Sequence, residues 1–314
     1  MKKNIIMAFF VLFSYEIEAQ ESKTVYNFLR LPVSAHAAAL GGENISIDDD
    51  DPTLVFHNPA LASNVADRSL NLNYMTYMEG VKVASASFVK AFRERATWAL
   101  EAQYVDYGTM KHTTVDNEVL GDVSAKDIAV GGTFTYTLSD KIAGGVTAKF
   151  VSSSLAGYNS IGVAVDLGVN YLNPDLGLSL SAVARNLGGQ LKAYEDDFEK
   201  LPFDLQLGVS KQLGESPLRF SVTMTRLHDW DDKFINHFIF GAEAFLSDNI
   251  WLGGGINPRR SDDMKISDGE SESSHGAGFS LGGGLQLDRF KLQVAYGKYH
   301  VSASSLIINV TYTI

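Results

Sequence analysis

The 314-residue sequence contains no cysteine, and only seven of its residues are proline. Without cysteine the chain can form neither a disulfide nor a lipid-modified N-terminal cysteine, so the usual staples of small secreted domains are excluded. After the N-terminal region, no stretch approaches about 18 consecutive apolar residues, which excludes a transmembrane helix there. A net charge of −11 argues against nucleic acid as a partner.

Glycine and aromatic residues, by contrast, are plentiful. The chain has 28 glycines, 18 phenylalanines and 13 tyrosines, and its apolar fraction of 45% is ordinary for a globular protein. This balance is typical of long antiparallel strands with aromatic belts. A closed β-barrel would hold such a fold together without disulfides.

Residues 1–19 have the pattern of a signal peptide. Lys2 and Lys3 form a positive head, the run from Ile5 to Tyr15 is apolar, and Ala19 is a small residue suited to cleavage. The apolar run is too short to cross a bilayer as a helix. We therefore predict cleavage after Ala19, with a retained N-terminal anchor as the alternative.

From about residue 69 onward, apolar and polar residues alternate with a period of two. Trp98, Leu100, Ala102 and Tyr104, for example, alternate with Glu101 and its polar or small neighbours. The segments are about ten residues long, the length that a tilted transmembrane strand requires. The pattern predicts a transmembrane antiparallel β-barrel over 69–314 with about fourteen strands: 69–77, 81–90, 97–106, 126–138, 142–155, 161–172, 176–187, 202–213, 218–228, 236–246, 249–257, 274–287, 290–297 and 304–314.

The connections between these segments alternate in length. Every second one is a short turn rich in Asp, Asn, Ser, Gly or Pro, and the four longest fall among the others, at 107–125, 188–201, 229–235 and 258–273. Outer-membrane barrels have short periplasmic turns and longer external loops. We therefore expect both termini in the periplasm. We also expect Trp98 and Trp251 in an interfacial aromatic girdle, with packing in a core as the alternative.

Residues 20–68 do not follow the strand pattern. Four alanines between residues 35 and 39 favour a short helix, which Gly41-Gly42 would end. Asn58-Pro59-Ala60-Leu61 favours a second turn or short helix. The economical interpretation is a plug, or hatch, that folds back into the barrel lumen.

Three further features are weighed against binding or catalysis. The glycine runs 253–255 and 282–284 lack the lysine and helix of a phosphate loop, so we interpret them as places of close backbone approach. The acidic run Asp48 to Asp51 could bind a divalent cation, but it lacks the spacing of a calcium loop, and a solvated turn is favoured. The acidic stretch 261–274 is expected to be a mobile external loop.

The histidines give no catalytic pattern. No Gly-x-Ser-x-Gly and no His-Glu-x-x-His motif is present, and His228-Asp229 would need a serine nearby to form a triad. The seven histidines are scattered over loops and strand ends: His36, His57, His112, His228, His237, His275 and His300. We expect no enzymatic activity, no catalytic residue, no cofactor and no metal.

The N-terminal region resembles a known family. The runs Phe28 to Ala35, Ala39 to Ser46, Asp49 to Pro52 and Asn58 to Leu61 together look like the PorQ family of the Bacteroidetes type IX secretion system. The Asn-Pro-Ala element alone is shared more widely, with PorV and FadL-type transporters. Further matches are Arg185-Asn186-Leu187-Gly188, and Leu201-Pro202 with Leu205, Leu207 and Gly208, so the resemblance covers essentially the whole mature chain.

The resemblance implies a FadL-like barrel of fourteen strands with an N-terminal hatch. It also implies an attachment complex at the cell surface, in which PorU is a sortase-like peptidase, PorV carries cargo, and PorQ holds PorZ. We expect outer-membrane lipid and a PorZ-like protein as partners, with the four long loops as the contact surface. One rival is a FadL-type transporter with an apolar lumenal pocket and a lateral opening, and another is a barrel hydrolase.

Overall fold

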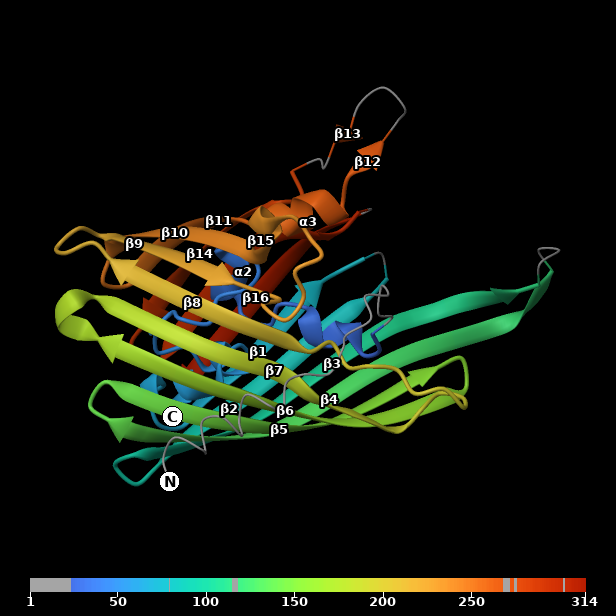
Figure 1. The fold of residues 1–314 in the computed structure, drawn as a ribbon, viewed down its shortest axis with the longest axis horizontal. Coiled ribbons are helices and arrows are strands. Elements are labelled where there is room, and N and C mark those ends of the chain that lie inside the picture. The colour runs from blue at the N-terminus through green and yellow to red at the C-terminus, as the bar shows by residue number, and fades with distance from the viewer. Residues whose placement is uncertain (1–23, 79, 115–117, 268–271, 274–275, 302) are drawn as a thin grey trace, which may run out of the picture.

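The computed structural model describes residues 24–78, 80–114, 118–267, 272–273, 276–301 and 303–314. Within this part, fourteen antiparallel strands close into a barrel (Figure 1), which confirms the predicted fold class. The barrel strands are β1 (Ser69–Thr76), β2 (Lys82–Phe92), β3 (Ala96–Thr113), β4 (Val119–Ser139), β5 (Ile142–Leu155), β6 (Tyr158–Asn173), β7 (Leu178–Lys192), β8 (Asp204–Gln212), β9 (Leu218–Met224), β10 (Phe238–Ser247), β11 (Ile250–Ile256), β14 (Phe279–Leu287), β15 (Phe290–His300) and β16 (Ala303–Thr313).

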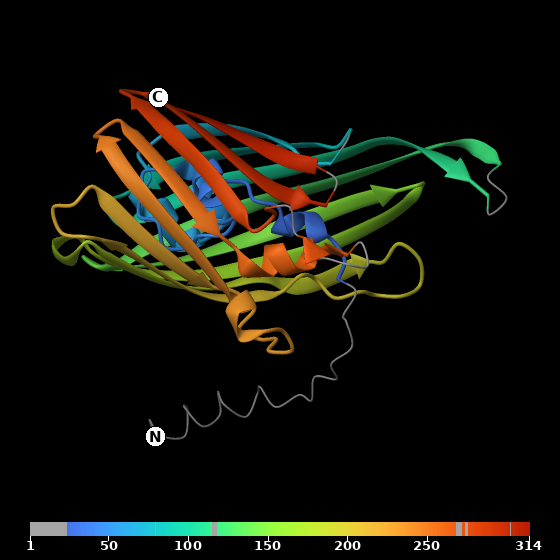
Figure 2. The same ribbon diagram turned by 90° about the horizontal axis from the view of Figure 1, so that it is seen from above.

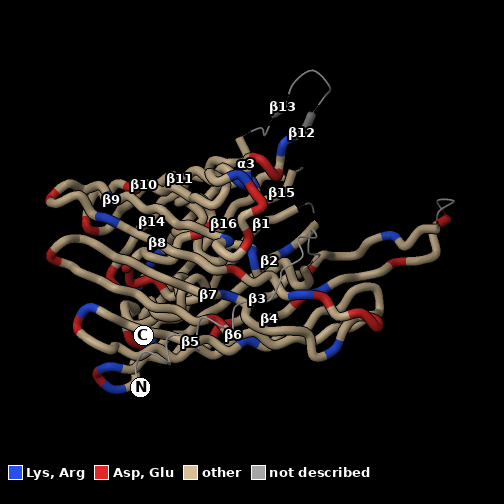
Figure 3. The backbone as a smooth tube through the Cα atoms, viewed as in Figure 1, with Lys and Arg blue, Asp and Glu red and all other residues tan. Residues whose placement is uncertain are grey.

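The strand alternation separates a polar interior from an apolar exterior. Along β1, Asn71 and Asn73 are buried, while Leu72 and Tyr74 face outward. Large apolar side chains recur on the outer faces of the other strands, and Figure 3 shows that most charged residues lie toward the barrel ends. This apolar outer surface is that of a transmembrane barrel. In the ranges that the structure describes, no helix is long and apolar enough to span a membrane.

The two ends of the barrel differ, as Figure 2 shows. The end that carries the C-terminus has short connections, and we call it the turn end: 93–95, 140–141, 174–177, 213–217, 248–249 and 288–289. The opposite end, here called the loop end, has the long connections 193–203, 225–237 and 257–278 as well as four shorter ones.

The predicted loop 107–125 is largely strand, and this prediction is therefore corrected. β3 and β4 stay paired as far as Thr113 and Val119. Their pairing with the neighbouring strands stops earlier, since β2 begins opposite Asp106 and β5 ends opposite Ala125. Residues 107–113 and 119–125 therefore form a two-stranded ribbon that projects beyond the barrel (Figure 1). Its sequence gave no strand signal because, beyond the barrel, neither lipid nor lumen imposes an alternating pattern.

The other predicted loops also contain regular structure. β7 extends to Lys192, into the predicted loop 188–201, and η5 (Phe234–His237) begins within 229–235. The range 258–273 contains the short helix α3 (Pro258–Asp263), and β12 (Ile266–Ser267) pairs with β13 (Glu272–Ser273) outside the barrel.

Residues 24–68 precede β1, and we call them the lumenal segment. The segment contains η1 (Asn27–Arg30), α2 (Ala35–Ala39), η2 (Pro52–Phe56) and η3 (Pro59–Asn64). Each of the last three begins at a polar cap, because Ser34, Asp51 and Asn58 accept a hydrogen bond from a backbone N–H two or three residues later. Pro52 and Pro59 follow their caps, where proline has no N–H to leave unpaired.

The lumenal segment runs the length of the barrel interior. It starts at the loop end, where the Val25 N–H donates to the carbonyl of Lys200 at 3.0 Å, and it ends at the turn end, where Ser69 pairs with Thr313. Val25 and the C-terminus therefore lie at opposite ends of the barrel, while the N-terminus itself, which we expect in the periplasm, lies outside the described residues. The alternation of short and long connections predicts the direction of the strands alone. It gives no information about a segment that precedes the first strand. The predicted signal peptide, 1–19, lies outside the described residues.

Candidate functional site in the filled lumen

Helix α2 and the residues after it lie directly against the barrel wall. Glycines make this approach sterically feasible. A Cβ atom added at Gly255 would lie 2.1 Å from the Leu40 carbonyl carbon, and one at Gly282 would lie 2.6 Å from the Ala39 Cβ atom. One glycine in each run, Gly255 and Gly282, thus lets the segment around the end of α2 lie directly on the wall. This agrees with the interpretation of the glycine runs as places of close backbone approach.

The Asn-Pro-Ala element holds a second part of the lumenal segment against the barrel wall. Asn58 caps η3 through its Oδ1 atom, and its Nδ2 atom donates to the Ile45 carbonyl at 2.9 Å. Pro59 lies against Gly145, and Asn58 lies against Gly168, where an added Cβ atom would be 2.1 Å from its Oδ1 atom. The motif therefore ties two turns of the lumenal segment together and places them on β5 and β6.

Gly41 and Gly42 shape the turn after α2. Both have φ near +108°, a left-handed region that glycine adopts readily. The Gly41 carbonyl accepts hydrogen bonds from Arg260 Nη1 and Asn257 Nδ2, both at 3.2 Å. Since Arg260 belongs to α3, this turn links the lumenal segment to the largest connection of the loop end.

A buried ionic cluster joins the segment to the wall. His36 Nε2 lies 2.7 Å from Glu243 Oε2, and His36 Nδ1 lies 3.3 Å from Asp49 Oδ2. The Arg219 guanidinium bridges the same two carboxylates, at 2.5 Å from Glu243 and 2.6 Å from Asp49, and it also contacts Asp48 at 3.1 Å. The acidic run is therefore not the solvated turn that we expected, because its charges find basic partners on strands that lie far away in sequence.

The charges of this cluster set the protonation of His36. Burial alone would lower its pKa, but the carboxylates of Glu243 and Asp49 outweigh burial and raise the pKa above its usual value. His36, Asp49 and Glu243 each offer one ligand atom, all within 4.8 Å of one another, which is a spacing that a metal ion could use. Arg219 already bonds both carboxylates. We therefore interpret the group as an ion-pair network.

A second network lies around Glu43. Its carboxylate contacts Arg185 Nη1 at 2.9 Å and His57 Nδ1 at 3.0 Å. A bulge in β7 aims Arg185 inward, because Arg185 and Asn186 together oppose the single residue Asp166 of β6. Asn186 has φ of 56°, and its N–H donates to Asp166 Oδ1 at 2.7 Å. The Arg-Asn-Leu-Gly run noted in the sequence is therefore the site of this bulge.

Two more ion pairs complete the contacts of the interior. Asp50 contacts Lys291 of β15, and Lys149 of β5 lies 2.5 Å from Asp166. Removing one partner of a buried pair leaves an uncompensated charge, which costs about 3–5 kcal/mol. The lumenal segment is therefore held by several contacts of this kind as well as by packing.

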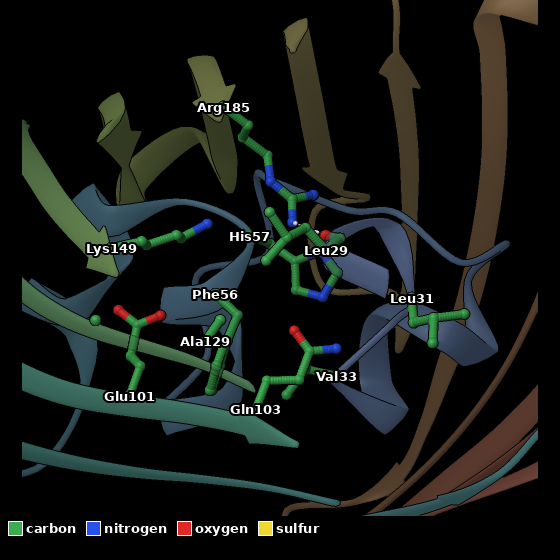
Figure 4. A pocket seen from close by; sticks show the side chains of 11 residues that line it. Leu29, Leu31, Val33, Phe56, His57, Glu101, Gln103, Ala129, Lys149 and Arg185 are labelled. Carbon is green, nitrogen blue, oxygen red and sulfur yellow. Dashed lines mark hydrogen bonds between the residues drawn. The ribbon is translucent and has the colours of Figure 1, made fainter. Parts of the chain in front are cut away.

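A small cavity lies between the lumenal segment and the wall. This cavity of about 20 Å³ is lined by Leu29, Phe56, Glu101, Lys149 and Arg185, among others. Figure 4 shows Glu101 and Lys149 facing this space from the wall, with Arg185 on its far side. A buried water needs a volume of about 10–15 Å³, so the cavity has room for about one water molecule.

The two tryptophans predicted for a girdle lie on different faces of the wall. Trp98 faces outward, in edge contact with Phe88 at 6.0 Å between ring centroids, and its place in a lipid girdle stays a prediction. Trp251 faces the lumen and stacks on His36 at 3.9 Å. The girdle prediction for Trp251 is therefore wrong. The neighbouring Leu252, 53% exposed, takes the outward position, so strand alternation turns Trp251 inward.

Three of the histidines contact acceptors or carboxylates rather than a serine hydroxyl. His36 and His57 hydrogen-bond to carboxylates rather than to serine, and His237 Nδ1 lies 3.0 Å from the Thr225 carbonyl oxygen. His275 lies outside the described residues. None of these three histidines is placed as the base of a Ser–His–acid triad.

Sequence reasoning missed the ionic partners Glu43, Arg219, Glu243 and Lys291. A signal was present, because Arg219, Glu243 and Lys291 fall on the polar phase of otherwise apolar strands. What the sequence lacked was the pairing, since His36 and Glu243 are 207 residues apart.

These features define a transmembrane β-barrel whose lumen is filled by its own N-terminal segment. No protein-family model and no curated protein sequence matches the chain. Solved structures with the same fold include the toluene transporter TodX of Pseudomonas putida, with a TM-score of 0.55 and 15% identity over 90% of this chain and 97% of that one. A FadL homologue of Pseudomonas aeruginosa has a TM-score of 0.56 and 10% identity over 90% and 99%. The monoaromatic hydrocarbon channel CymD has a TM-score of 0.58 and 13% identity over 90% and 97%. The chain thus has the fold of FadL-like barrels.

Proposed function

We propose that the chain is a non-enzymatic outer-membrane barrel that holds a protein partner at its loop end. The resemblance to the PorQ family gives the partner as a PorZ-like surface protein, within an attachment complex that also contains PorU and PorV. In this proposal the turn end faces the periplasm and the loop end faces the cell surface, as the lengths of the connections favour.

The filled lumen is the observation that carries the proposal. A channel or carrier needs space for its cargo, and ligand pockets usually measure about 300–1,000 Å³. The interior cavity described above measures about 20 Å³, and ion pairs join the lumenal segment to β7, β9, β10 and β15. A barrel closed in this way is suited to act through its surface.

The loop end offers that surface. The ribbon of 107–113 and 119–125 carries Met110, Val119 and Leu120, which are 41%, 61% and 61% exposed. Trp230 and Phe234, in the connection 225–237, are also exposed, with ring centroids 6.3 Å apart. Exposed aromatic and aliphatic groups on a polar rim are typical of protein contact sites.

Affinity purification from native outer membrane tests the proposal. The full chain is compared with a variant in which an Asn-Gly turn replaces 107–124, and with a control that carries a short Gly-Ser insertion in the turn-end connection 213–217. We expect a PorZ-like protein to remain bound to the full chain and to the control but not to the ribbon variant. Equal retention by all three barrels, with each still folded, would contradict the proposal.

A FadL-type transporter of hydrophobic small molecules is the second candidate. It is favoured by the shared fold with proteins titled as a toluene transporter and a monoaromatic hydrocarbon channel, and by Leu29, Leu31, Val33 and Phe56 on one side of the cavity. This function requires the lumenal segment to move. Toluene uptake by lipid vesicles that contain the protein, at a rate above that of empty vesicles, would favour transport over the scaffold function.

A further inference from the structure

Asp127 lies where the ribbon leaves the barrel. It belongs to β4 and is paired with Val105 of β3 and Ser153 of β5, one register position below the last pair between β2 and β3. Its side chain faces inward and is 9% exposed. Asp127 thus faces the lumen close to the loop end.

The groups around Asp127 donate hydrogen bonds to its carboxylate. The Tyr107 hydroxyl donates to Oδ2 at 2.7 Å, and the Ser153 hydroxyl donates to Oδ1. The Tyr194 hydroxyl in turn donates to Ser153 Oγ. Both oxygens of the Asp127 carboxylate therefore accept a hydrogen bond from a hydroxyl group.

The Asp127 carboxylate has no cationic partner in the part of the chain that the structure describes. Glu43, Asp49, Asp166 and Glu243 are also in the interior, and each lies within 3 Å of a lysine or arginine nitrogen. Asp127 forms hydrogen bonds to hydroxyl groups but takes part in no such ion pair. Burial of a carboxylate without a cationic partner is unfavourable, so a cation that reached this site would be attracted to it.

The surroundings favour an organic cation over a metal ion. A hard metal ion takes about six oxygen ligands, whereas the site offers one carboxylate and a few hydroxyls. The rings of Tyr107 and Tyr194 are half-buried beside it, and tyrosine rings attract ammonium and guanidinium groups.

The connection next to the site selects for positive charge. Tyr194 is followed by Glu195, Asp196, Asp197 and Glu199, all of them exposed. Between them Phe198 is 67% exposed. Such a rim repels anionic lipid headgroups and attracts a basic protein surface, to which Phe198 adds an apolar contact.

We propose that Asp127, Tyr107 and Tyr194 form a socket for a lysine or arginine side chain, which a basic protein partner inserts from the cell surface. The inference rests on the proposed function in one respect, that the ligand belongs to a protein. The acidic connection 193–203 steers the partner, and the socket fixes one of its side chains.

Peptide binding to the full chain in lipid nanodiscs tests the socket. The probe is tetralysine, acetylated and amidated at its ends, with tetraglutamine capped in the same way as the neutral comparison. Asp127→Asn removes the buried charge, and Glu195→Gln is the matched control, since it makes the same change of charge on the exposed rim. We expect Asp127→Asn to weaken tetralysine binding by about tenfold or more and Glu195→Gln by about threefold or less.

Two further measurements keep the test decisive. Tyr194→Leu leaves the carboxylate in place but removes the ring, and should weaken binding by about threefold or more. Circular dichroism and the electrophoretic shift of unheated barrel establish that each variant is folded. Unchanged binding by Asp127→Asn, or equal loss in Asp127→Asn and Glu195→Gln, would overturn the socket.

The two proposals fail in different ways. If tetralysine binding depends on Asp127 but no protein is retained in native membrane, the scaffold function is wrong and the socket stands. If a PorZ-like protein is retained but Asp127→Asn does not change the affinity for tetralysine, the socket is wrong and the scaffold function stands.

Discussion

The imidazole of His36 lies flat against the indole of Trp251, with ring centroids 3.9 Å apart and an angle of 18° between the planes. This contact packs one residue of the lumenal segment against one residue of the wall, while both nitrogens of the imidazole face carboxylates. Packing and charge thus act on the same side chain. Because the raised pKa of His36 favours the charged ring, its ion pairs are fully present below pH 6.5 and weaken as the pH rises through the raised value.

The placement of Trp251 can be checked by fluorescence. Three variants, each keeping one of the three tryptophans, are reconstituted in vesicles with brominated lipid. We expect strong quenching of Trp98, which faces outward, and little quenching of Trp251, because the wall separates its ring from the acyl chains. Strong quenching of Trp251 would contradict its lumenal position.

Loss of Arg219 should destabilise the protein. Arg219→Met leaves Asp48, Asp49 and Glu243 without their shared cation, and we expect the free energy of unfolding to fall by about 3–5 kcal/mol. Urea unfolding in lipid vesicles, followed by circular dichroism, measures the change. Lys141→Met is the control, since its 4.0 Å pair with Asp175 lies at the exposed turn end and should contribute less than about 1 kcal/mol. Equal losses in the two variants would refute the buried network as a source of stability.

The close contact between Gly255 and the lumenal segment predicts that a larger residue at this position destabilises the protein. Gly255→Ala places a methyl group against the Leu40 and Gly41 backbone, which cannot yield as a flexible side chain would. We expect a loss of about 1–3 kcal/mol in the free energy of unfolding. We also expect faster proteolysis within residues 24–68. Gly132→Ala is the matched control, because no atom lies within 4 Å of the added methyl group. Resistance to protease equal to that of the unmodified protein would show that the segment does not need this glycine.

The sequence predicts the barrel and a lumenal plug, but not the contacts that hold the plug in place. Strand number and the order of short turns follow from period-two alternation, because lipid outside and polar groups inside act on every strand in the same way. The position of Trp251 could also have been predicted, since Leu252 beside it is the better lipid-facing residue. The pairing of Asp49 with Arg219 could not, because it depends on how a non-repetitive segment crosses the lumen.

The acid stability of the lumenal segment should depend on Glu43. Burial would raise the pKa of this carboxyl, but Arg185 and His57 outweigh burial and lower it from 4.5 to about 2. A group whose pKa is lowered on folding contributes stability that is complete above its unfolded value and is lost as the pH falls toward its folded value. The contribution of Glu43 is therefore present above pH 4.5 and disappears as the pH approaches 2.

The variant Glu43→Gln separates this contribution from general acid denaturation. It should be less stable than the unmodified protein at neutral pH, and the difference in the free energy of unfolding should shrink as the pH falls from 4.5 toward 2. Glu195→Gln, on the exposed connection 193–203, should keep the unmodified pH profile because solvent already compensates its charge. The midpoint of urea unfolding, measured across this range for all three proteins, gives the comparison. A difference for Glu43→Gln that stays constant with pH would mean that the side chain acts through packing rather than through its ion pair with Arg185.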